Sequence, residues 1–293
     1  MRILVTGANG LLGRKLVSLL DSQPGIYLMA SARKAISFST RCDTSILDVT
    51  DPEALERVVD RARPDVIINA AAMTQVDLCE QQREECWKQN VESVRNLVTV
   101  CLKNNIHLVH VSTDFVFNGK EGPLDESAVP EPVNYYGESK LEGERLILKS
   151  NCPAAIVRTV LVYGVTSDMS RSNIVLWVKR NLEEKKPIRV VNDQFRTPTL
   201  AEDLAMGCFL AATKRAKGIF HISGDEMMTP YDIAIRTADF FKLDKSLITP
   251  VTNFVQPAAR PLRTGFIIDK AKRELGYQPH SFREGLELLA LSL

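Results

Sequence analysis

The chain has 293 residues, of which 45% are hydrophobic and 25% are charged. This composition is that of a globular protein with a sizeable core, and it excludes a low-complexity chain and a small scaffold held by disulfides. The 37 basic and 36 acidic side chains leave a net charge of +1, which provides no field to hold a nucleic acid or an anionic membrane surface.

The six cysteines are scattered without a Cys-x-x-Cys pair, and the chain has only four histidines. This pattern fits neither a zinc site nor a disulfide framework, so we expect no bound metal. A strand-like run begins at Arg2, so we expect no signal segment, and the longest apolar stretch, residues 152–165, is shorter than a membrane span. We therefore expect a cytoplasmic protein that binds neither nucleic acid nor membranes.

Through the first half of the chain, short runs rich in β-branched residues alternate with segments in which apolar residues recur at helical spacing. The predicted strands are Arg2–Thr6, Ile26–Ala30, Asp65–Asn69, His107–Ser112 and Ala154–Thr159, and the predicted helices are Leu11–Leu20, Pro52–Ala62, Asp77–Asn104 and Tyr135–Leu148. This alternation predicts an α/β fold with a Rossmann-type, doubly wound parallel sheet. The strands lack polar alternation, which indicates that helices cover both faces.

Beyond about residue 165 the pattern loosens into helices separated by loops that contain proline. The predicted helices there are Asn173–Lys185, Leu200–Lys214, Pro230–Phe241 and Phe282–Leu291. We expect a dinucleotide-binding domain over residues 1–165, to which a segment of about 187–215 returns. Residues 166–293 are expected to form mainly a smaller, interleaved lobe that binds the substrate.

A glycine-rich turn, residues 6–13 (TGANGLLG), follows the first predicted strand and opens a predicted helix. Glycines at such a turn let backbone N–H groups approach a pyrophosphate, whose charge is favoured at a helix N-terminus. The residues expected to line this cofactor site are Gly7, Asn9, Gly10, Leu11, Leu12 and Gly13. The spacing differs from the usual Gly-x-Gly-x-x-Gly fingerprint, and the alternative is a plain loop whose glycines serve geometry alone.

The end of the second predicted strand would carry an acid in a site that prefers an unphosphorylated ribose. Arg33 and Lys34 stand there instead. A guanidinium can bind a 2′-phosphate through two hydrogen bonds, which favours NADP over NAD, although both side chains could also be solvated loop charges. Asp48, with the Val49 amide, is a candidate contact for the adenine amino group, or else an N-terminal acid for the helix that begins at Pro52.

Small residues follow the strand that ends at residue 69. Backbone that lies against a flat ligand at the carboxyl edge of a sheet needs such side chains, so Ala70, Ala71 and Ala72 are predicted cofactor contacts, together with Thr74. Packing under a helix would require the same pattern. Val76 is expected to face the same crevice and to contact the substrate.

The most specific pattern combines Thr113 at a strand end with Tyr136 and Lys140 on a predicted helix. The tyrosine and the lysine share one helical face, and an ammonium group beside a phenol favours the phenolate. Tyr136 would exchange a proton with a substrate oxygen that the Thr113 hydroxyl orients, and Lys140 would also reach the cofactor ribose. The neighbouring Tyr135 has Ser139 four residues on, which supplies no charge. A tyrosine and a lysine at this spacing are common on surface helices, so the prediction depends on their combination with the glycine turn and with Thr113 at a strand end.

In these motifs the sequence resembles the extended short-chain dehydrogenase/reductases, and more narrowly the dTDP-4-dehydrorhamnose reductases. The resemblance runs to about residue 285 and is carried by residues 112–119 (STDFVFNG), 136–144 (YGESKLEGE), 158–159 (RT), 192–195 (NDQF) and 198–199 (PT). It implies hydride transfer from NADPH or NADH to the C4 ketone of a nucleotide-linked 6-deoxyhexulose in polysaccharide biosynthesis. Thr113, Tyr136 and Lys140 would be the catalytic residues, with Asn90 either positioning Lys140 through water or packing between helices. Dimers are usual in this superfamily, which makes a homodimer a candidate assembly.

The rhamnose-forming members of that family carry an aromatic residue where this sequence has Leu161, so the identity of the sugar is open. Leu161 is still expected to contact the substrate. For the substrate diphosphate, Arg196 and Arg263 are the first candidates because arginine forks match phosphate oxygens, whereas each could also be a surface ion-pair partner.

Two other functions stay open. A regulatory subunit that binds NADP without chemistry, like the β subunit of methionine adenosyltransferase, shares this ancestry, but intact Thr113, Tyr136 and Lys140 argue against it. A nucleotide-sugar epimerase would retain NAD, which the basic pair Arg33 and Lys34 disfavours. A dehydratase is not among them, because the related dehydratases carry Asp-Glu directly after the catalytic threonine, where this chain has Asp-Phe and therefore lacks the second acid.

Overall fold

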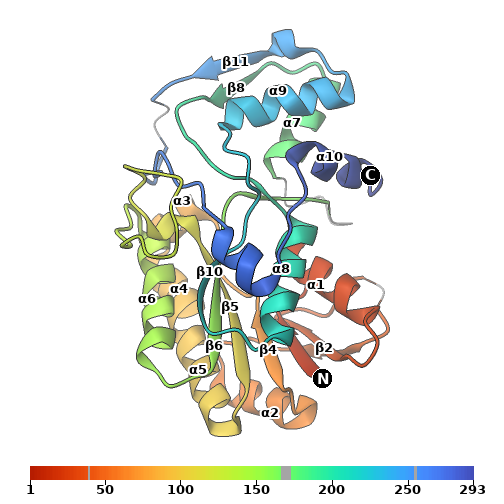
Figure 1. The fold of residues 1–293 in the computed structure, drawn as a ribbon, viewed down its shortest axis with the longest axis vertical. Helices are drawn as coiled ribbons and strands as arrows, with labels where there is room; N and C mark the ends of the chain where they lie inside the picture. The colour runs from red at the N-terminus through yellow and green to blue at the C-terminus, as the bar shows by residue number, and fades with distance from the viewer. Residues whose placement is uncertain (39, 166–172, 254–255) are drawn as a thin grey trace.

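A computed structural model describes residues 1–38, 40–165, 173–253 and 256–293, and shows a sheet between helices with a smaller group of elements above it (Figure 1). The seven strands of the sheet run parallel in the order β10-β6-β5-β4-β1-β2-β3. They are β1 (Arg2–Thr6), β2 (Tyr27–Ala32), β3 (Asp43–Ile46), β4 (Val66–Asn69), β5 (His107–Thr113), β6 (Ala154–Thr159) and β10 (Gly218–His221). The predicted α/β fold with a doubly wound parallel sheet is therefore confirmed.

Helices cover both faces of this sheet (Figure 1). On one side lie α1 (Leu11–Asp21) and α8 (Ala201–Thr213), and on the other α2 (Pro52–Ala62), α5 (Ser93–Asn104) and α6 (Tyr135–Lys149). Successive strand residues belong to different core clusters: Val5 and Ile68 pack with α1 and α8, whereas Leu4 and Ile67 pack with α2 and α5. Both faces are apolar, which explains why the strands lack polar alternation.

The single helix predicted over residues 77–104 is wrong. The structure has α3 (Val76–Gln81), α4 (Arg83–Trp87), a π-helical turn η1 (Lys88–Glu92) and then α5. Gln82 has φ −124° and ψ 59°, so the backbone leaves helical geometry there. The wider π turn lies between α4 and α5, and such turns are frequent at functional sites.

The upper part of the molecule consists of two short parallel strands against two helices. These are β8 (Ile188–Val191) paired with β11 (Ile248–Val251), and α7 (Ile174–Glu183) packed against α9 (Pro230–Phe241), with α10 (Phe282–Ala290) beside them. The remaining elements are β7 (Val162–Tyr163), β9 (Thr199–Leu200), η2 (Asp114–Val116), η3 (Lys245–Leu247) and η4 (Ala271–Leu275). Late segments return to the sheet, since α8 packs against α1 and β10 pairs with β6.

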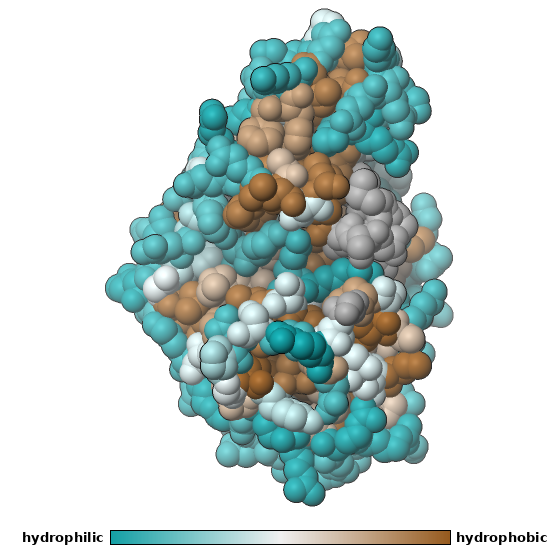
Figure 2. Space-filling view, turned by 90° about the vertical axis from the view of Figure 1, so that its right-hand side faces the viewer, coloured by the Kyte–Doolittle hydropathy of each residue, from teal (hydrophilic) through white to brown (hydrophobic). Residues whose placement is uncertain are grey.

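The face shown in Figure 2 is hydrophilic at its rims, and hydrophobic atoms gather toward its middle, in both the upper and the lower part. Within the described ranges, no helix is long and apolar enough to cross a membrane.

Candidate active site

The glycine turn packs against the alanine segment at the carboxyl edge of the sheet. Gly7 has φ +72°, and a Cβ on it would come within 2.7 Å of the backbone of Ala70 and Ala71. A Cβ on Gly13 would come within 2.2 Å of the Gly7 carbonyl oxygen, so helix α1 can begin this close to the turn only with glycine there. Gly10 is the N-cap of α1 and its N–H donates to the Gly7 carbonyl at 2.9 Å. These segments form a cradle of the kind that a pyrophosphate requires.

The segment after β2 is tied to the same turn. Asn9 Nδ2 donates to the carbonyl oxygens of Lys34, at 3.3 Å, and Ala35, at 3.0 Å. The side chains of Arg33 and Lys34 are exposed, which leaves two cations at the surface beside the turn. Asp48 accepts from the N–H and the hydroxyl of Thr50, at 2.9 and 2.8 Å. The N-cap of α2 is Asp51, whose side chain accepts from Ala54 N.

Helix α6 presents Tyr136 to the end of β5. Asn134 caps the helix by accepting from Gly137 N at 2.8 Å, and a Cβ at Gly137 would come 2.2 Å from the carbonyl oxygen of Phe115. The ring of Tyr136 meets that of Phe115 edge to face, with 5.8 Å between centroids. The glycine therefore lets the helix approach the segment that follows Thr113.

The environment of Tyr136 holds the phenol in its neutral form. Burial raises the pKa of its hydroxyl above the ordinary value, a hydrogen bond with the Thr113 side chain lowers it, and the Asp114 carboxylate raises it. This direction is opposite to the one expected from an adjacent ammonium group. Burial is the largest cause of this direction, and Lys140 Nζ donates to the Val111 carbonyl at 2.7 Å.

Lys140, one turn further along α6, is buried against β5, with 2% of its surface exposed. Its Nζ lies 2.7 Å from the Val111 oxygen and 3.3 Å from His110 Nε2. Burial lowers the pKa of Lys140 to about 8, while Glu144 and Cys86 raise it. A cation whose pKa falls near neutrality at the carboxyl edge of such a sheet is a candidate functional group.

Asn90 lies on the π turn and links two parts of the site. Its Oδ1 accepts from Met73 N at 2.9 Å, and its Nδ2 donates to the Met73 carbonyl and to Ser139 Oγ, each at 3.0 Å. The amide therefore ties the segment after the alanines to helix α6. Of the two roles weighed for Asn90, the packing role has these direct contacts.

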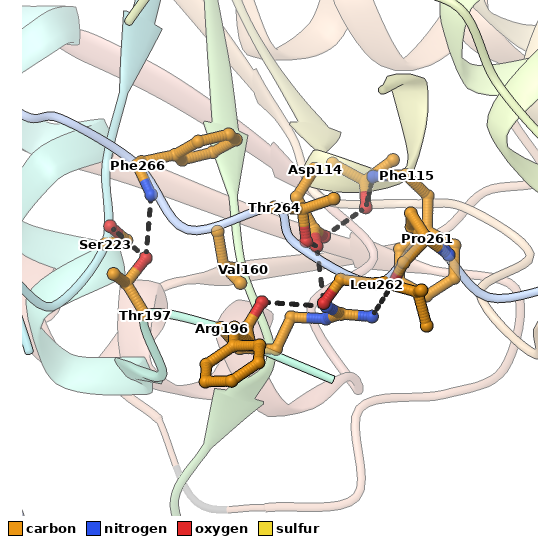
Figure 3. A network of polar contacts seen from close by, with 12 residues as sticks. Asp114, Phe115, Val160, Arg196, Thr197, Ser223, Pro261, Leu262, Thr264 and Phe266 are labelled. Atoms are coloured by element: carbon orange, nitrogen blue, oxygen red, sulfur yellow. Dashed lines mark hydrogen bonds and ion pairs between the residues drawn. The ribbon is translucent and has the colours of Figure 1, made fainter. Parts of the chain in front are cut away.

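A second network joins Asp114, the residue after Thr113, to Arg196 and Thr264 (Figure 3). Thr113 Oγ1 donates to Asp114 Oδ1 at 3.1 Å, and the other oxygen of this buried carboxylate accepts from Thr264 Oγ1 and lies 3.6 Å from Arg196 Nε. Burial raises the pKa of Asp114, and Arg196 lowers it. The carboxylate thus connects three segments that lie far apart in the sequence.

The Arg196 guanidinium is 4% exposed and faces protein oxygens. Its Nη1 and Nη2 donate to the carbonyls of Phe195, Leu262 and Pro261, at 2.8, 3.2 and 2.5 Å. Arg263, in contrast, is exposed and lies over the ring of Phe195, 4.5 Å from its centroid. Of the two predicted diphosphate contacts, Arg263 is the one at the surface.

The other predicted substrate contacts are spread around the site. Val76 begins α3 and packs in the cluster that contains Tyr136, while Thr74 is exposed. Leu161 has φ +38°, a left-handed conformation that is unusual for leucine, and packs between two core clusters. In the described parts of the chain, no group of three or more metal-ligating side chains occurs.

Sequence reasoning missed three groups that the structure places around Tyr136 and Lys140. Asp114 was considered only as part of a motif, His110 only as a member of the predicted strand His107–Ser112, and Ser139 only as a neutral neighbour. His110 is 1% exposed, as the strand would place it, but its contact with Lys140 does not follow from residue spacing.

Comparisons with known proteins show which family the chain is similar to. Residues 1–292 match the family model described as the RmlD substrate binding domain. The methionine adenosyltransferase 2 subunit beta of Xenopus laevis is 34% identical over 257 residues, which cover 86% of this chain and 75% of that one. The dTDP-4-dehydrorhamnose reductase of Aggregatibacter actinomycetemcomitans is 32% identical over 300 residues, covering 98% and 97%.

Two solved structures match along the whole chain. The dTDP-4-dehydrorhamnose reductase of Clostridium acetobutylicum superposes with a TM-score of 0.89 at 29% identity, covering 100% of both chains. That of Bacillus anthracis, solved in complex with NADP, gives a TM-score of 0.87 at 30% identity and covers 100% of this chain and 99% of that one.

Proposed function

The chain belongs to the RmlD substrate binding domain family, and from this premise we propose that it is an NADPH-dependent reductase of the C4 ketone of a nucleotide-diphospho-4-keto-6-deoxyhexose. The observation that carries the proposal is the placement of Tyr136, at the start of α6, beside Thr113 at the carboxyl end of β5, where the Thr113 side chain lowers the pKa of the phenol, together with the glycine cradle at the same edge of the sheet. Relatives named dTDP-4-dehydrorhamnose reductase, similar over the full chain, support the substrate class.

The cradle fits a dinucleotide, because added Cβ atoms at Gly7 and Gly13 would collide with backbone. In the proposal the pyrophosphate is held by residues of the turn, the ribose by Tyr136 and Lys140, the adenine by Asp48 and Val49, and further contacts come from Ala70, Ala71, Ala72 and Thr74. The exposed Arg33 and Lys34 would bind a 2′-phosphate, and the related structure solved with NADP supports this preference over NAD. When bound, NADPH supplies the hydride.

Tyr136 supplies the proton in this proposal. Reduction of a ketone to an alcohol needs a proton at the carbonyl oxygen, and burial keeps the phenol of Tyr136 protonated. Thr113 places its hydroxyl beside that phenol and orients the same oxygen. Leu161 and Val76 would contact the sugar and Arg263 the diphosphate, whereas Arg196 would have to release carbonyl partners before it could bind a phosphate.

Turnover tests this assignment. We expect the purified chain to oxidise NADPH with one or more sugars of a panel of dTDP-linked and UDP-linked 4-keto-6-deoxyhexoses, and Tyr136→Phe to slow it by roughly 10²-fold or more, since the proton donor is lost. Tyr135→Phe is the matched control and should retain turnover. Equal turnover in Tyr136→Phe would reject the proton donor, and no oxidation with any sugar would reject the reductase.

A second candidate function is a regulatory subunit. It is favoured by the similarity to methionine adenosyltransferase 2 subunit beta, at 34% identity. Co-purification with a methionine adenosyltransferase, together with no NADPH oxidation on the sugar panel, would establish it in place of the reductase.

The domain division is also part of the proposal. Residues 1–165, with the segment of about 187–215, would form the dinucleotide-binding domain of a cytoplasmic homodimer, and residues 166–293 would mainly bind the substrate. Analytical ultracentrifugation of the purified chain tests the dimer.

A further inference from the structure

A row of buried polar side chains crosses three strands of the sheet and ends at Lys140. Thr6 on β1, Asn69 on β4 and His110 on β5 are register partners in neighbouring strands, and each is 1% exposed. Thr6 Oγ1 donates to Asn69 Oδ1 at 2.5 Å, Asn69 Nδ2 lies 3.0 Å from His110 Nδ1, and His110 Nε2 lies 3.3 Å from Lys140 Nζ. The row thus connects the start of the glycine turn with helix α6.

The orientation of the Asn69 amide follows from a backbone donor. Ala71 N donates to Asn69 Oδ1 at 3.3 Å, and a backbone N–H cannot exchange roles with an acceptor. The oxygen of the amide must therefore face Ala71 and Thr6, and its NH₂ group must face His110. Nδ1 of His110 is then an acceptor, which places the proton of the neutral ring on Nε2.

The ring is neutral because of where it lies. Burial holds the pKa of His110 well below its ordinary value, and Lys140 lowers it further. Nε2–H therefore points toward Lys140 Nζ. Two donors face each other when Lys140 is an ammonium, whereas a neutral amine at Nζ can accept from Nε2–H and still donate to the Val111 carbonyl.

We propose that Asn69 and His110 are positioning residues for the reductase proposed above, which hold the ring as its Nε2–H tautomer and thereby favour the neutral form of Lys140 beside the cofactor site. Their action is indirect, since neither touches the phenol of Tyr136 in the described contacts. Because Lys140 is part of the proposed chemistry, the row would set the upper end of the pH range in which turnover is high.

Other charged and titratable groups also face Lys140. Glu144, one turn further along α6, and Cys86 on α4 both raise its pKa, yet burial dominates and the value is about 8. Glu144 is engaged by Arg158, whose Nε and Nη2 donate to it at 3.0 and 2.6 Å. The carboxylate that could best neutralise Lys140 is therefore directed to another cation, and on the β5 side Lys140 Nζ meets the Val111 carbonyl and, among described side chains, the His110 ring.

Nitrogen NMR of the full chain reads the tautomer directly. In protein labelled with ¹⁵N-histidine, protonated and unprotonated ring nitrogens have well-separated shifts, and the His110 signals are identified by their loss in His110→Phe. We expect Nε2 of His110 to carry the proton and Nδ1 to be bare. A proton on Nδ1 in the unaltered chain would overturn the proposal, and this measurement does not depend on any variant folding.

The charge of Lys140 is followed in protein labelled with ¹³Cε-lysine, through the shift of its ε-carbon against pH. In His110→Phe the opposing N–H is gone, and in Asn69→Asp a carboxylate takes the proton on Nδ1, so that Nε2 can accept from the ammonium. We expect the midpoint of Lys140 to rise by about one pH unit or more in both variants. The matched control is His107→Phe, a buried histidine of the same strand without ring partners in the described structure, and should leave the midpoint unchanged.

Unchanged midpoints in both variants would overturn the proposal. Turnover adds a separate readout: with an active sugar, the alkaline limb of the rate profile should move with the Lys140 midpoint. If the chain oxidises NADPH with none of the sugars in the panel, the proposed function fails. The His110 tautomer and the Lys140 midpoint can still be measured, and they test the role of Asn69 and His110 independently.

Discussion

Two buried cations at helix α6 are held in different ways: Lys140 belongs to the helix itself, and Arg158 on β6 binds Glu144, one turn further along it. Arg158 on β6 meets Glu144 through three hydrogen bonds of 3.0, 3.2 and 2.6 Å, and Ser112 Oγ donates to the same carboxylate at 2.5 Å. Lys140 has a carbonyl oxygen and an imidazole as its hydrogen-bonding neighbours in the described structure.

The difference separates a structural charge from a functional one. The buried pair of Arg158 and Glu144 fixes β6 against α6, although Arg158 Nη1 has no hydrogen-bond partner in the described structure. A buried ammonium without a carboxylate partner destabilises the fold when it is charged and titrates near neutrality, which is of use in a site that handles protons. Four substitutions test this contrast.

The largest effect is expected at the paired cation. Glu144→Ala would leave the buried guanidinium of Arg158 without its counter-charge, and we expect the free energy of unfolding to fall by ~3–5 kcal/mol. Urea unfolding followed by tryptophan fluorescence measures it. Glu142→Ala is the control on the same helix, because its partner Arg145 lies 3.3 Å away at the surface, and it should cost less than ~1 kcal/mol. Similar losses in both variants would erase the contrast.

Removal of the other cation should act in the opposite direction. The pKa of Lys140 is about 8 in the fold against an ordinary 10.5. The fold disfavours the charged form of this lysine. The contribution to stability is therefore fully present above the ordinary pKa, where lysine is neutral in both the folded and the unfolded state, and is lost as pH falls through the folded pKa. Lys140→Met should therefore be more stable than the unaltered chain at neutral pH, by ~3 kcal/mol at most, and the gap should close as pH rises toward 10.5. Urea unfolding across this range measures the gap, and a constant gap would contradict the unpaired charge.

Asp114 is intermediate between the closely paired Arg158 and Lys140, which has no carboxylate partner in the described structure. Its carboxylate is 3.6 Å from Arg196 and accepts from two threonine hydroxyls. Asp114→Asn keeps the shape but replaces one acceptor by a donor, so we expect a loss of ~2 kcal/mol in the free energy of unfolding. The same unfolding experiment measures it. A loss as large as that of Glu144→Ala would place Asp114 with the structural pairs.

The smallest effect is expected at the far end of the polar row. Thr6→Val removes one hydroxyl from Asn69 Oδ1, which still accepts from Ala71 N, so the free energy of unfolding should fall by ~1 kcal/mol. The Lys140 midpoint should stay where it is, because the amide keeps its orientation. A midpoint that moved would show that the Ala71 contact alone does not hold Asn69.

The sequence predicted the sheet and helix α6 because their signals are local. Apolar strands, a glycine turn and a tyrosine four residues before a lysine can be recognised within short windows. Strand β3, with the sequence DTSI and largely exposed, has no apolar signal, and nothing in the residues around Gln82 marks the break between α3 and α4.

The partners of buried charges were not predictable from spacing. Lys140 and Glu144 stand four apart, the spacing of a helical ion pair, yet Arg158 from a neighbouring strand binds the glutamate. Asp114 meets residues 196 and 264, and this choice depends on how two distant loops return to the end of β5. The same tertiary packing reversed the expected direction of the Tyr136 pKa.

Gly137 limits how this tyrosine and lysine could be moved to another protein. The helix that carries them touches the carbonyl oxygen of Phe115 where any other residue would place a Cβ atom. A graft that transfers the two reactive side chains alone would hold them too far from the threonine. Transplantation therefore has to carry the glycine and the short turn at residues 114–116 as one unit, and an alanine at position 137 would separate the pair from its partner without altering either side chain.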